Sequence, residues 1–292
     1  QALKDPNCRV TSINLSQNDL DDEFRARDIA DALRSNQTIT DIDLSGNKIP
    51  VAGIKKIAQA LESNSTVTKF YMSANGLSAD GVQAITKALV KPNSNITELI
   101  LTNNGINSEG VRHIAEALKN QNCKITKLYL GGNDIGLLGA VAIAGALEDR
   151  NCRVVELVLN GCNLIDGAVN VISNALKHPN CKVAKLFLNL NGITRDGAKH
   201  IAEALKDRNC SVKEIHLSTN VIMSEVAKAL VEALKHENCK VQKITLISNG
   251  IGDDVTRELQ GLLRDKPNLQ IYGNSGALLE PAQEGVQEEG MG

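Results

Sequence analysis

The sequence predicts an α/β solenoid, in which short parallel strands line one concave face and helices cover the outside. A single motif recurs every 28–29 residues through most of the 292-residue chain. Within each copy, one half has the alternating pattern of a strand and the other half has the apolar spacing of an amphipathic helix. The chain also has three Tyr, three Phe and no Trp, so its core is built from Leu, Ile, Val and Ala. A repeat of this kind buries its apolar surface by stacking on its neighbours.

The motif is clearest at residues 125–135, which read Ile-Thr-Lys-Leu-Tyr-Leu-Gly-Gly-Asn-Asp-Ile. Its leading apolar residue occurs nine times, at Val10, Ile39, Val67, Ile96, Ile125, Val154, Val183, Val212 and Val241. Its polar residue follows in register at Asn18, Asn47, Asn75, Asn104, Asn133, Cys162, Asn191, Asn220 and Asn249. This pattern, L-x-x-L-x-L-x-x-N/C-x-L, resembles the leucine-rich repeat. The resemblance implies a horseshoe of nine repeats with a parallel concave sheet and convex outer helices.

The first half of each copy predicts a short strand. Strand alternation points Leu128 and Leu130 into the core, and residues 127, 129 and 131 away from it. The Asn that follows can satisfy backbone groups of the turn that leaves the strand. Asn-Gly pairs such as Asn104-Gly105 favour a sharp bend at that point.

The second half predicts a helix. Val111, Ile114, Ala115 and Leu118 are spaced to form one apolar stripe, and other copies repeat the spacing. A glycine such as Gly110 stands just before the stripe, where a small residue lets the start of the helix pack close to its neighbour. Because no copy can bury its stripe alone, we expect one cooperative repeat domain.

The two ends depart from the repeat. We expect the repeat domain to cover residues 1–272, with a degenerate closing strand at residues 269–272. Residues 273–292 are rich in Gly, Gln and Glu and predict a flexible acidic tail. Residues 2–8 match the helix end and exit loop at residues 175–181. The chain therefore starts inside a repeat, and we expect it to be a fragment of something longer.

Composition and motifs argue against several classes of function. The net charge of −2 lacks the basic excess of a nucleic-acid-binding protein, and no apolar run is long enough to span a membrane. No phosphate-binding, zinc-protease or serine-hydrolase motif occurs, so we expect neither an enzyme nor a cofactor or metal site.

All seven cysteines occupy repeat positions. Six precede the leading apolar residue by two positions and the seventh takes the Asn position: Cys8, Cys123, Cys152, Cys181, Cys210, Cys239 and Cys162. They form no C-x-x-C pair, which argues for a structural role over metal binding. We predict reduced thiols in a cytoplasmic protein, and a column of neighbouring thiols that is vulnerable to cooperative oxidation.

Two outward-facing columns of the sheet are candidates for binding. The first alternates in charge over eight repeats: Asp41, Lys69, Glu98, Lys127, Glu156, Lys185, Glu214 and Lys243. Such a column is either a ladder that avoids like-charge repulsion or a polar rail beside a binding groove. The second column reads Asn14, Asp43, Tyr71, Ile100, Tyr129, Val158, Phe187, His216 and Thr245.

A run of apolar and aromatic side chains in the second column is expected to face water and to mark a protein contact surface. We predict that a protein partner binds there, and that it contacts Tyr71, Ile100, Tyr129, Val158, Phe187 and His216 together with Lys127, Glu156 and Lys185.

The period, the Asn-Cys pair before each strand and the helix pattern G-x-x-x-I-A-x-A-L resemble the ribonuclease-inhibitor-like subfamily of leucine-rich repeats. That subfamily includes sensor regions of nucleotide-binding receptors, Ran GTPase-activating proteins and secreted effectors of intracellular bacteria. The resemblance implies a non-catalytic module that binds proteins through its concave face. Uniform repeats, no Trp and no acidic excess argue against ribonuclease inhibition itself.

Three contexts remain open on this resemblance. The chain is a bacterial effector acting in the host cytosol, the sensor region of a larger receptor, or a GTPase-activating protein that supplies an arginine in trans. Arg25 and Arg27, in the connection between the first strand and its helix, are the candidates for that arginine. We expect a monomer.

Overall fold

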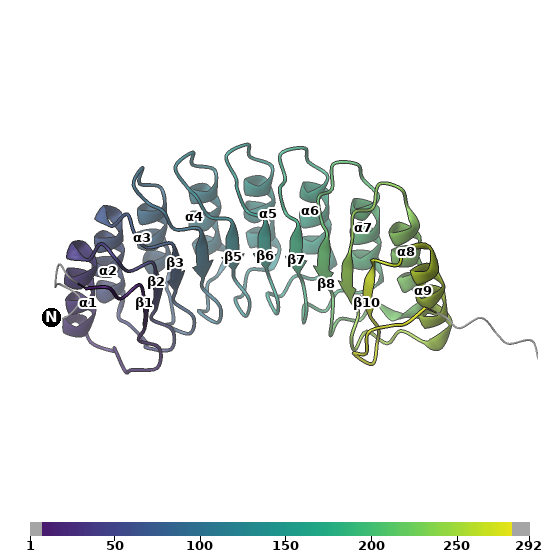
Figure 1. Ribbon diagram of the computed structural model, residues 1–292, viewed down its shortest axis with the longest axis horizontal. Helices are drawn as coiled ribbons and strands as arrows, with labels where there is room; N and C mark the ends of the chain where they lie inside the picture. The colour runs from purple at the N-terminus through teal and green to yellow at the C-terminus, as the bar shows by residue number, and fades with distance from the viewer. Residues whose placement is uncertain (1–7, 282–292) are drawn as a thin grey trace, which may run out of the picture.

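The computed structural model describes residues 8–281. Within them, ten strands alternate with nine helices (Figure 1). Their bounds are β1 Ser12–Asn14, α1 Glu23–Ser35, β2 Asp41–Asp43, α2 Val51–Ser63, β3 Lys69–Tyr71, α3 Ala79–Leu89, β4 Glu98–Ile100, α4 Ser108–Leu118, β5 Lys127–Tyr129, α5 Gly136–Leu147, β6 Glu156–Val158, α6 Asp166–Leu176, β7 Lys185–Phe187, α7 Arg195–Leu205, β8 Glu214–His216, α8 Met223–Lys235, β9 Lys243–Thr245, α9 Asp253–Asp265 and β10 Gln270–Tyr272.

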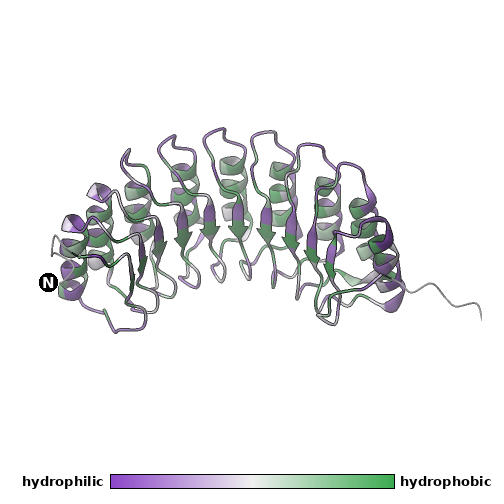
Figure 2. Cartoon of the chain, viewed as in Figure 1, coloured by the Kyte–Doolittle hydropathy of each residue, from purple (hydrophilic) through white to green (hydrophobic). Residues whose placement is uncertain are grey.

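The strands form one parallel sheet in chain order from β1 to β10, and each helix packs against the helices of the adjacent repeats. The repeats follow one another along an arc, with β1 and β10 at its opposite ends (Figure 1). Hydrophobic residues lie mainly in the strands and helices, and the connecting loops are mostly hydrophilic (Figure 2). The predicted parallel α/β solenoid is confirmed.

The core lies between the sheet and the helices, as the two apolar patterns predict. Leu128 and Leu130 are fully buried, and so are the stripes of the helices. The glycines before those stripes allow close packing. A Cβ added to Gly53 would lie 2.6 Å from the Cβ of Ala26 and 3.0 Å from Cγ2 of Ile49, so only glycine fits there without a shift.

The Asn column ties each repeat to its neighbour. In Asn133, Nδ2 donates to the carbonyls of Leu130 and Leu101 at 2.8 and 3.0 Å. Its Oδ1 accepts from the backbone N–H groups of Asn104 and Ile106, both at 3.0 Å. The sequence predicted that this amide satisfies the turn of its own repeat. The structure adds that three of these four partners belong to the preceding repeat.

Two repeats depart from this pattern. Cys162 replaces the amide, and its Sγ donates to the Leu130 carbonyl at 3.1 Å. Asn249 keeps the amide, but its buried Oδ1 has no partner among the described residues. The loop before α8 takes another path there, because Met223 adopts a left-handed φ of 61° and donates its N–H to the Asn249 carbonyl at 2.9 Å.

A second set of asparagines joins the repeats at the opposite edge, where helices lead into strands. Nδ2 of Asn151, in the Asn-Cys pair, donates to the carbonyl of Lys119 at the end of α4, the helix of the preceding repeat, at 2.8 Å. The same bond recurs from Asn122, Asn180, Asn209 and Asn238. These bonds satisfy helix-end carbonyls that would otherwise lack a partner.

The folded domain continues beyond the predicted boundary at residue 272. Oδ1 of Asn274 accepts from the N–H of Asn249 at 2.8 Å and so extends the amide column by one position. The N–H of Leu279 then donates to the carbonyl of Ile271 at 2.8 Å, and its side chain packs against the core. The remainder of the expected acidic tail, residues 282–292, and the expected start inside a repeat, residues 1–7, lie outside the described residues.

Candidate functional site

The strand register aligns the predicted contact residues in one column. Six successive strands pair Tyr71, Ile100, Tyr129, Val158, Phe187 and His216 as direct neighbours. Thr245 and Tyr272 extend the column to β10. Their role in binding stays a prediction, but their spatial alignment is a property of the fold.

The expectation that this column faces water freely is wrong. Most of its side chains are half-buried, Val158 is only 9% exposed, and the side chain of His216 is 14% exposed. Adjacent strands lie about 4.8 Å apart, so side chains in one outward column cover one another. The column is therefore a packed surface and not a row of separate apolar groups.

Two tyrosines of the column are held by carboxylates of the neighbouring column. Oη of Tyr129 donates to Oε1 of Glu156 at 2.5 Å, and Oη of Tyr71 donates to Oε1 of Glu98 at 3.2 Å. Burial and the nearby Glu98 raise the pKa of Tyr71 to about 12. Burial and the bond to Glu156 raise the pKa of Tyr129 as well. Both phenols are therefore protonated donors with fixed orientations.

The other end of the column is fixed by a ring stack. The rings of Phe187 and His216 lie 4.2 Å apart between centroids, with an interplanar angle of 7°. Nε2 of His216 lies 2.9 Å from Oε1 of Glu214, and its Nδ1 lies 3.2 Å from Oγ1 of Thr245. Burial lowers the pKa of His216, and this outweighs the opposing effect of Glu214. The imidazole is thus neutral at neutral pH and is held on both nitrogens.

The charged column forms ion pairs across adjacent strands. Lys69 pairs with Asp41 at 3.1 Å and Lys127 with Glu98 at 3.4 Å. Glu214 receives both Lys185 and Lys243, at 3.2 and 2.8 Å. Burial alone would raise the pKa of Glu214, but the bonds from Lys243, His216 and Lys185 lower it to about 2.

The two signs of charge are exposed to different extents. The side chains of Lys127 and Lys185 are 47% and 49% exposed, whereas those of Glu98 and Glu214 are 13% and 16% exposed. The ammonium groups therefore project further from the sheet than the carboxylates that pair with them. Although the column is formally balanced, a partner approaching the concave face meets mostly lysine.

Arg25 and Arg27 lie in the first half of α1 and not in the loop where the sequence placed them. Asp22 caps the helix by accepting the N–H of Arg25 at 2.8 Å, so the helix begins before both arginines. Nε of Arg25 pairs with Asp22 at 3.1 Å, and its guanidinium also donates to the Asp19 carbonyl at 2.6 Å. Both partners hold the guanidinium against the helix start.

All seven cysteines are free, and five of them are buried. Burial raises the pKa of Cys123, Cys162 and Cys181 to about 11, and it also raises that of Cys152 and Cys210. A pKa near 11 leaves at least about a hundredfold less thiolate at neutral pH than an ordinary cysteine has. Because the thiolate is the reactive form, the buried thiols are chemically quiet.

Titration of the native protein with a thiol reagent should therefore detect only Cys8 and Cys239, the two partly exposed cysteines. Unfolding in denaturant without reductant should then release all seven thiols. The measurement is the absorbance of the released chromophore before and after denaturation. Fewer thiols after unfolding would mean that the native protein holds disulfides, and rapid native labelling of five more would contradict their burial.

Other site types find little support in residues 8–281. No group of three or more His, Cys, Asp or Glu is placed to hold a metal ion in this part of the chain. None of the helices in the same range combines the length and apolar character needed to cross a membrane.

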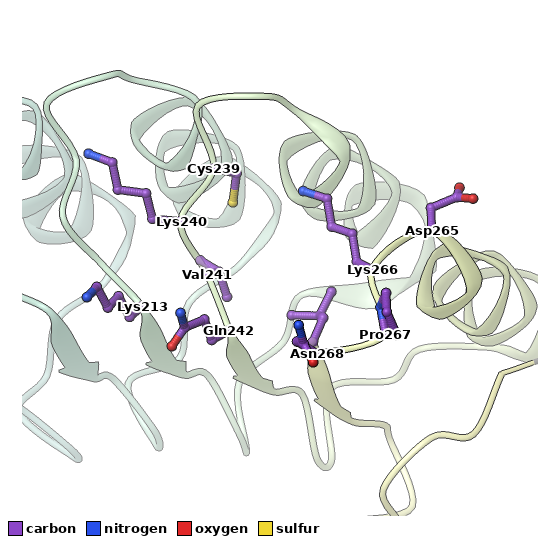
Figure 3. Close-up of a pocket in the computed structure, with 10 residues that line it drawn as sticks. Lys213, Cys239, Lys240, Val241, Gln242, Asp265, Lys266, Pro267 and Asn268 are labelled. Atoms are coloured by element: carbon purple, nitrogen blue, oxygen red, sulfur yellow. The ribbon is translucent and has the colours of Figure 1, made fainter.

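A cavity of about 500 Å³ lies beside the last repeats, with Lys240 and Lys266 among its lining residues (Figure 3). Both ammonium groups already bind backbone carbonyls, of Arg208 and Leu234 respectively. These two cations thus serve the fold.

One exposed apolar surface, on α5, was not predicted from the sequence. Leu137, Leu138 and Val141 on α5 are 50%, 72% and 50% exposed, more than any residue of the concave column from Tyr71 to His216. The signal that could have revealed them is a comparison of outer helix positions between repeats. The positions of Leu138 and Val141 correspond to Glu109 and Arg112 in α4, one repeat earlier.

Comparisons with known proteins agree with the fold. A family model described as leucine-rich repeat matches residues 35–58, 93–115 and 121–144. The chain is similar to a leucine-rich repeat-containing protein, LegL7, from Legionella pneumophila, at 21% identity and a TM-score of 0.59, over 94% of this chain and 87% of that one. It also resembles leiomodin-1 actin-binding site 2, at 20% identity and a TM-score of 0.39, over 60% of this chain and 84% of that one. No curated protein matches the sequence. The chain thus has the fold of a leucine-rich-repeat solenoid, while its place in the ribonuclease-inhibitor-like subfamily stays a prediction.

Proposed function

We propose that this leucine-rich-repeat protein is a non-catalytic binding module that holds a protein partner on its concave face. The central column from Tyr71 to His216 is the contact surface, and Lys127, Glu156 and Lys185 border it. The observation that carries the proposal is that the aromatic side chains of this column are aligned and already fixed by bonds within the protein.

Fixed side chains favour binding because association otherwise costs about 0.5–1.5 kcal/mol for each flexible side chain that it immobilises. Tyr129 is held by Glu156, and Phe187 is held by its stack on His216. Tyr and Phe are also residue types that act as anchors in protein interfaces. The partial burial of the column reduces its apolar area, but it makes the remaining surface rigid.

The exposed lysines indicate the chemistry of the partner. Lys127 and Lys185 project from the concave face while their carboxylate partners lie deeper. A partner that presents Asp or Glu side chains beside an apolar patch would complement both columns. The free cysteines support a reducing compartment, and we propose the cytoplasm. The same surface suits either an effector or the sensor region of a receptor.

Replacing both Tyr129 and Phe187 with alanine should abolish capture of the partner. Losing two anchors of a contact surface weakens binding by about 100-fold or more. The measurement compares proteins retained by the immobilised wild type and by the variant, with each retained protein identified by mass spectrometry. Phe24→Ala is the matched control, because Phe24 is a 79% exposed aromatic on α1, away from the column.

A second variant separates binding from folding. Lys127→Gln with Lys185→Gln removes two exposed ammonium groups without placing carboxylates on adjacent strands, so we expect thermal unfolding to change little and binding to fall by about tenfold. The wild type and Phe24→Ala define the set of captured proteins. If the double variant of Tyr129 and Phe187 and the double variant of Lys127 and Lys185 both retain that set equally well, the concave face is not the binding surface.

A further inference from the structure

Helix α5 has an unusual outer face for this array. Its sequence, Gly-Leu-Leu-Gly-Ala-Val-Ala-Ile-Ala-Gly-Ala-Leu, contains no polar side chain, and it is hydrophobic along its length (Figure 2). One side of it packs in the core, as in the other helices. The other side exposes Leu137, Leu138 and Val141 to solvent.

The other repeats show what this face normally carries. The positions of Leu138, Val141 and Gly145 hold an acid, a base and an acid in three other helices: Glu109, Arg112 and Glu116 in α4, Asp196, Lys199 and Glu203 in α7, and Glu225, Lys228 and Glu232 in α8. Folding alone does not require apolar residues here, because the charged helices fold in the same way. Neighbouring apolar residues exposed on the outer face of one helix, where equivalent helices carry charges, indicate a contact surface.

From the surroundings of α5 we infer that its outer face binds a second copy of this chain about a two-fold axis. The axis lies perpendicular to the helices and crosses α5 at the level of residue 143, so that the two α5 helices pack antiparallel. Each Val141 then lies against Gly145 of the second copy. A Cβ on Gly145 would meet nothing within 4 Å, so this glycine leaves space for the incoming valine.

The same axis makes the neighbouring helices complementary to themselves. The axis also crosses α4, at the level of residue 114, which lies one repeat of 29 residues before residue 143. Antiparallel pairing about that level sets Arg112 against Glu116, and Glu109 against Lys119, of the second copy. These four residues, with Leu138, Val141 and Gly145, line one groove of about 530 Å³ between α4 and α5. Opposite charges therefore meet at both of these pairs, and within one chain Lys119 also pairs with Glu116 at 3.0 Å.

On the other side of α5 the pairing is neutral. One repeat later the axis crosses α6 at residue 172, which sets Asn170 against Asn174 of the second copy. Within one chain Nδ2 of Asn174 donates to Oδ1 of Asn170 at 3.2 Å, so this pair presents no charge to the second copy. The axis thus places a charged pair, an apolar pair and an amide pair in three successive helices, at equivalent positions of the repeat.

The curvature of the array is compatible with this contact. α5 is the fifth of the nine described helices and lies at the middle of the arc (Figure 1). Two convex surfaces touch first along their central helices, while the long side chains of Arg112, Glu116 and Lys119 bridge the wider gap at α4. The concave columns lie on the opposite side of the sheet and stay free for a partner.

A second copy accounts for this face better than a lipid surface does. Interfacial helices are flanked by an excess of Lys and Arg. The flank at α4 is balanced, with Glu109 and Glu116 against Arg112 and Lys119. Although the sequence led us to expect a monomer, the outer face of α5 favours a back-to-back dimer.

The test is sedimentation equilibrium of the full chain between about 1 and 100 µM, a range that spans the dissociation constants of weak interfaces. We expect the wild type to shift from monomer to dimer with concentration, and Leu138→Glu to stay monomeric throughout. Leu190→Glu is the matched control and should dimerise as the wild type does, because Leu190 is 60% exposed in the loop before α7. Unchanged thermal unfolding would show that Leu138→Glu folds.

Charge reversal tests the arrangement of the two copies. Arg112→Glu and Glu116→Arg should each raise the dissociation constant about tenfold, and the double variant should restore it, because each residue faces the other across the axis. A wild type that is monomeric at the highest concentration would overturn the inference. A dimer insensitive to Leu138→Glu, or a double variant without rescue, would do so too.

Discussion

Replacing Asn133 with alanine should lower the free energy of unfolding by about 3–5 kcal/mol, because it leaves two buried backbone N–H groups without partners and removes one donor from each of two carbonyls. The N–H groups of Asn104 and Ile106 lose the Oδ1 acceptor, and the carbonyls of Leu101 and Leu130 lose the Nδ2 donor. Asn133 is 2% exposed, so water does not replace these bonds without a local opening. Urea unfolding followed by far-UV circular dichroism measures the loss.

The next repeat supplies the matched control. Cys162 occupies the same position, but its Sγ makes one close bond, to the Leu130 carbonyl. Cys162→Ala should therefore cost only about 1–2 kcal/mol. Equal losses for the two variants would show that filling the position matters and that the amide bonds between repeats do not.

The repeat positions explain how far the sequence predicts the fold. Leu128 and Leu130 recur at fixed spacing, and alternation alone places them in the core. The role of Gly53 could also be predicted, because a Cβ there would meet Ala26 of the preceding helix. Both predictions depend on periodicity, which is a property of the chain as written.

The period of the sequence does not show how far the side chains of adjacent repeats bury one another. Val158 faces outward as predicted, yet it is nearly buried, because lateral packing across the sheet depends on neighbours 29 residues away on both sides. Asn274 was assigned to a tail because its surroundings lack the repeat pattern, although it continues the amide column. Arg25 was placed in a loop because the cap at Asp22 falls in an irregular first repeat.

The two candidate surfaces, the concave column and the outer face of α5, also differ in how far the sequence reveals them. The concave column was visible because its residues stand out against strand alternation. The outer face of α5 was not, since apolar residues such as Leu138 and Val141 lie beside the apolar stripe of the same helix and do not interrupt its spacing. Only a comparison of equivalent outer positions, such as Leu138 with Glu109, separates a core residue from an exposed one.

Replacing Phe70 with alanine should also lower the free energy of unfolding by about 3–5 kcal/mol. The substitution truncates the largest fully buried side chain of the described residues and leaves a cavity. Phe70 takes a strand position that other repeats fill with Ile42, Leu99 or Leu128. Phe70→Leu therefore inserts the usual residue of the position and should cost less than about 1.5 kcal/mol, since the neighbours already fit a residue of this shape. Urea unfolding of both variants checks the difference.

Mapping where the structure is destabilised is a sharper test than the total loss of stability, because each repeat contacts only its neighbours. The cavity left by Phe70→Ala lies in β3 and weakens the contact that joins the first two repeats to the remaining array. Backbone hydrogen exchange should therefore accelerate most in β1 to α2, residues 12–63, and change little from β6 onward. Two repeats have too little neighbouring surface to remain folded once this contact weakens. Acceleration of equal size along the whole array would show instead that the repeats unfold only together, and that the interface at β3 has no separate role.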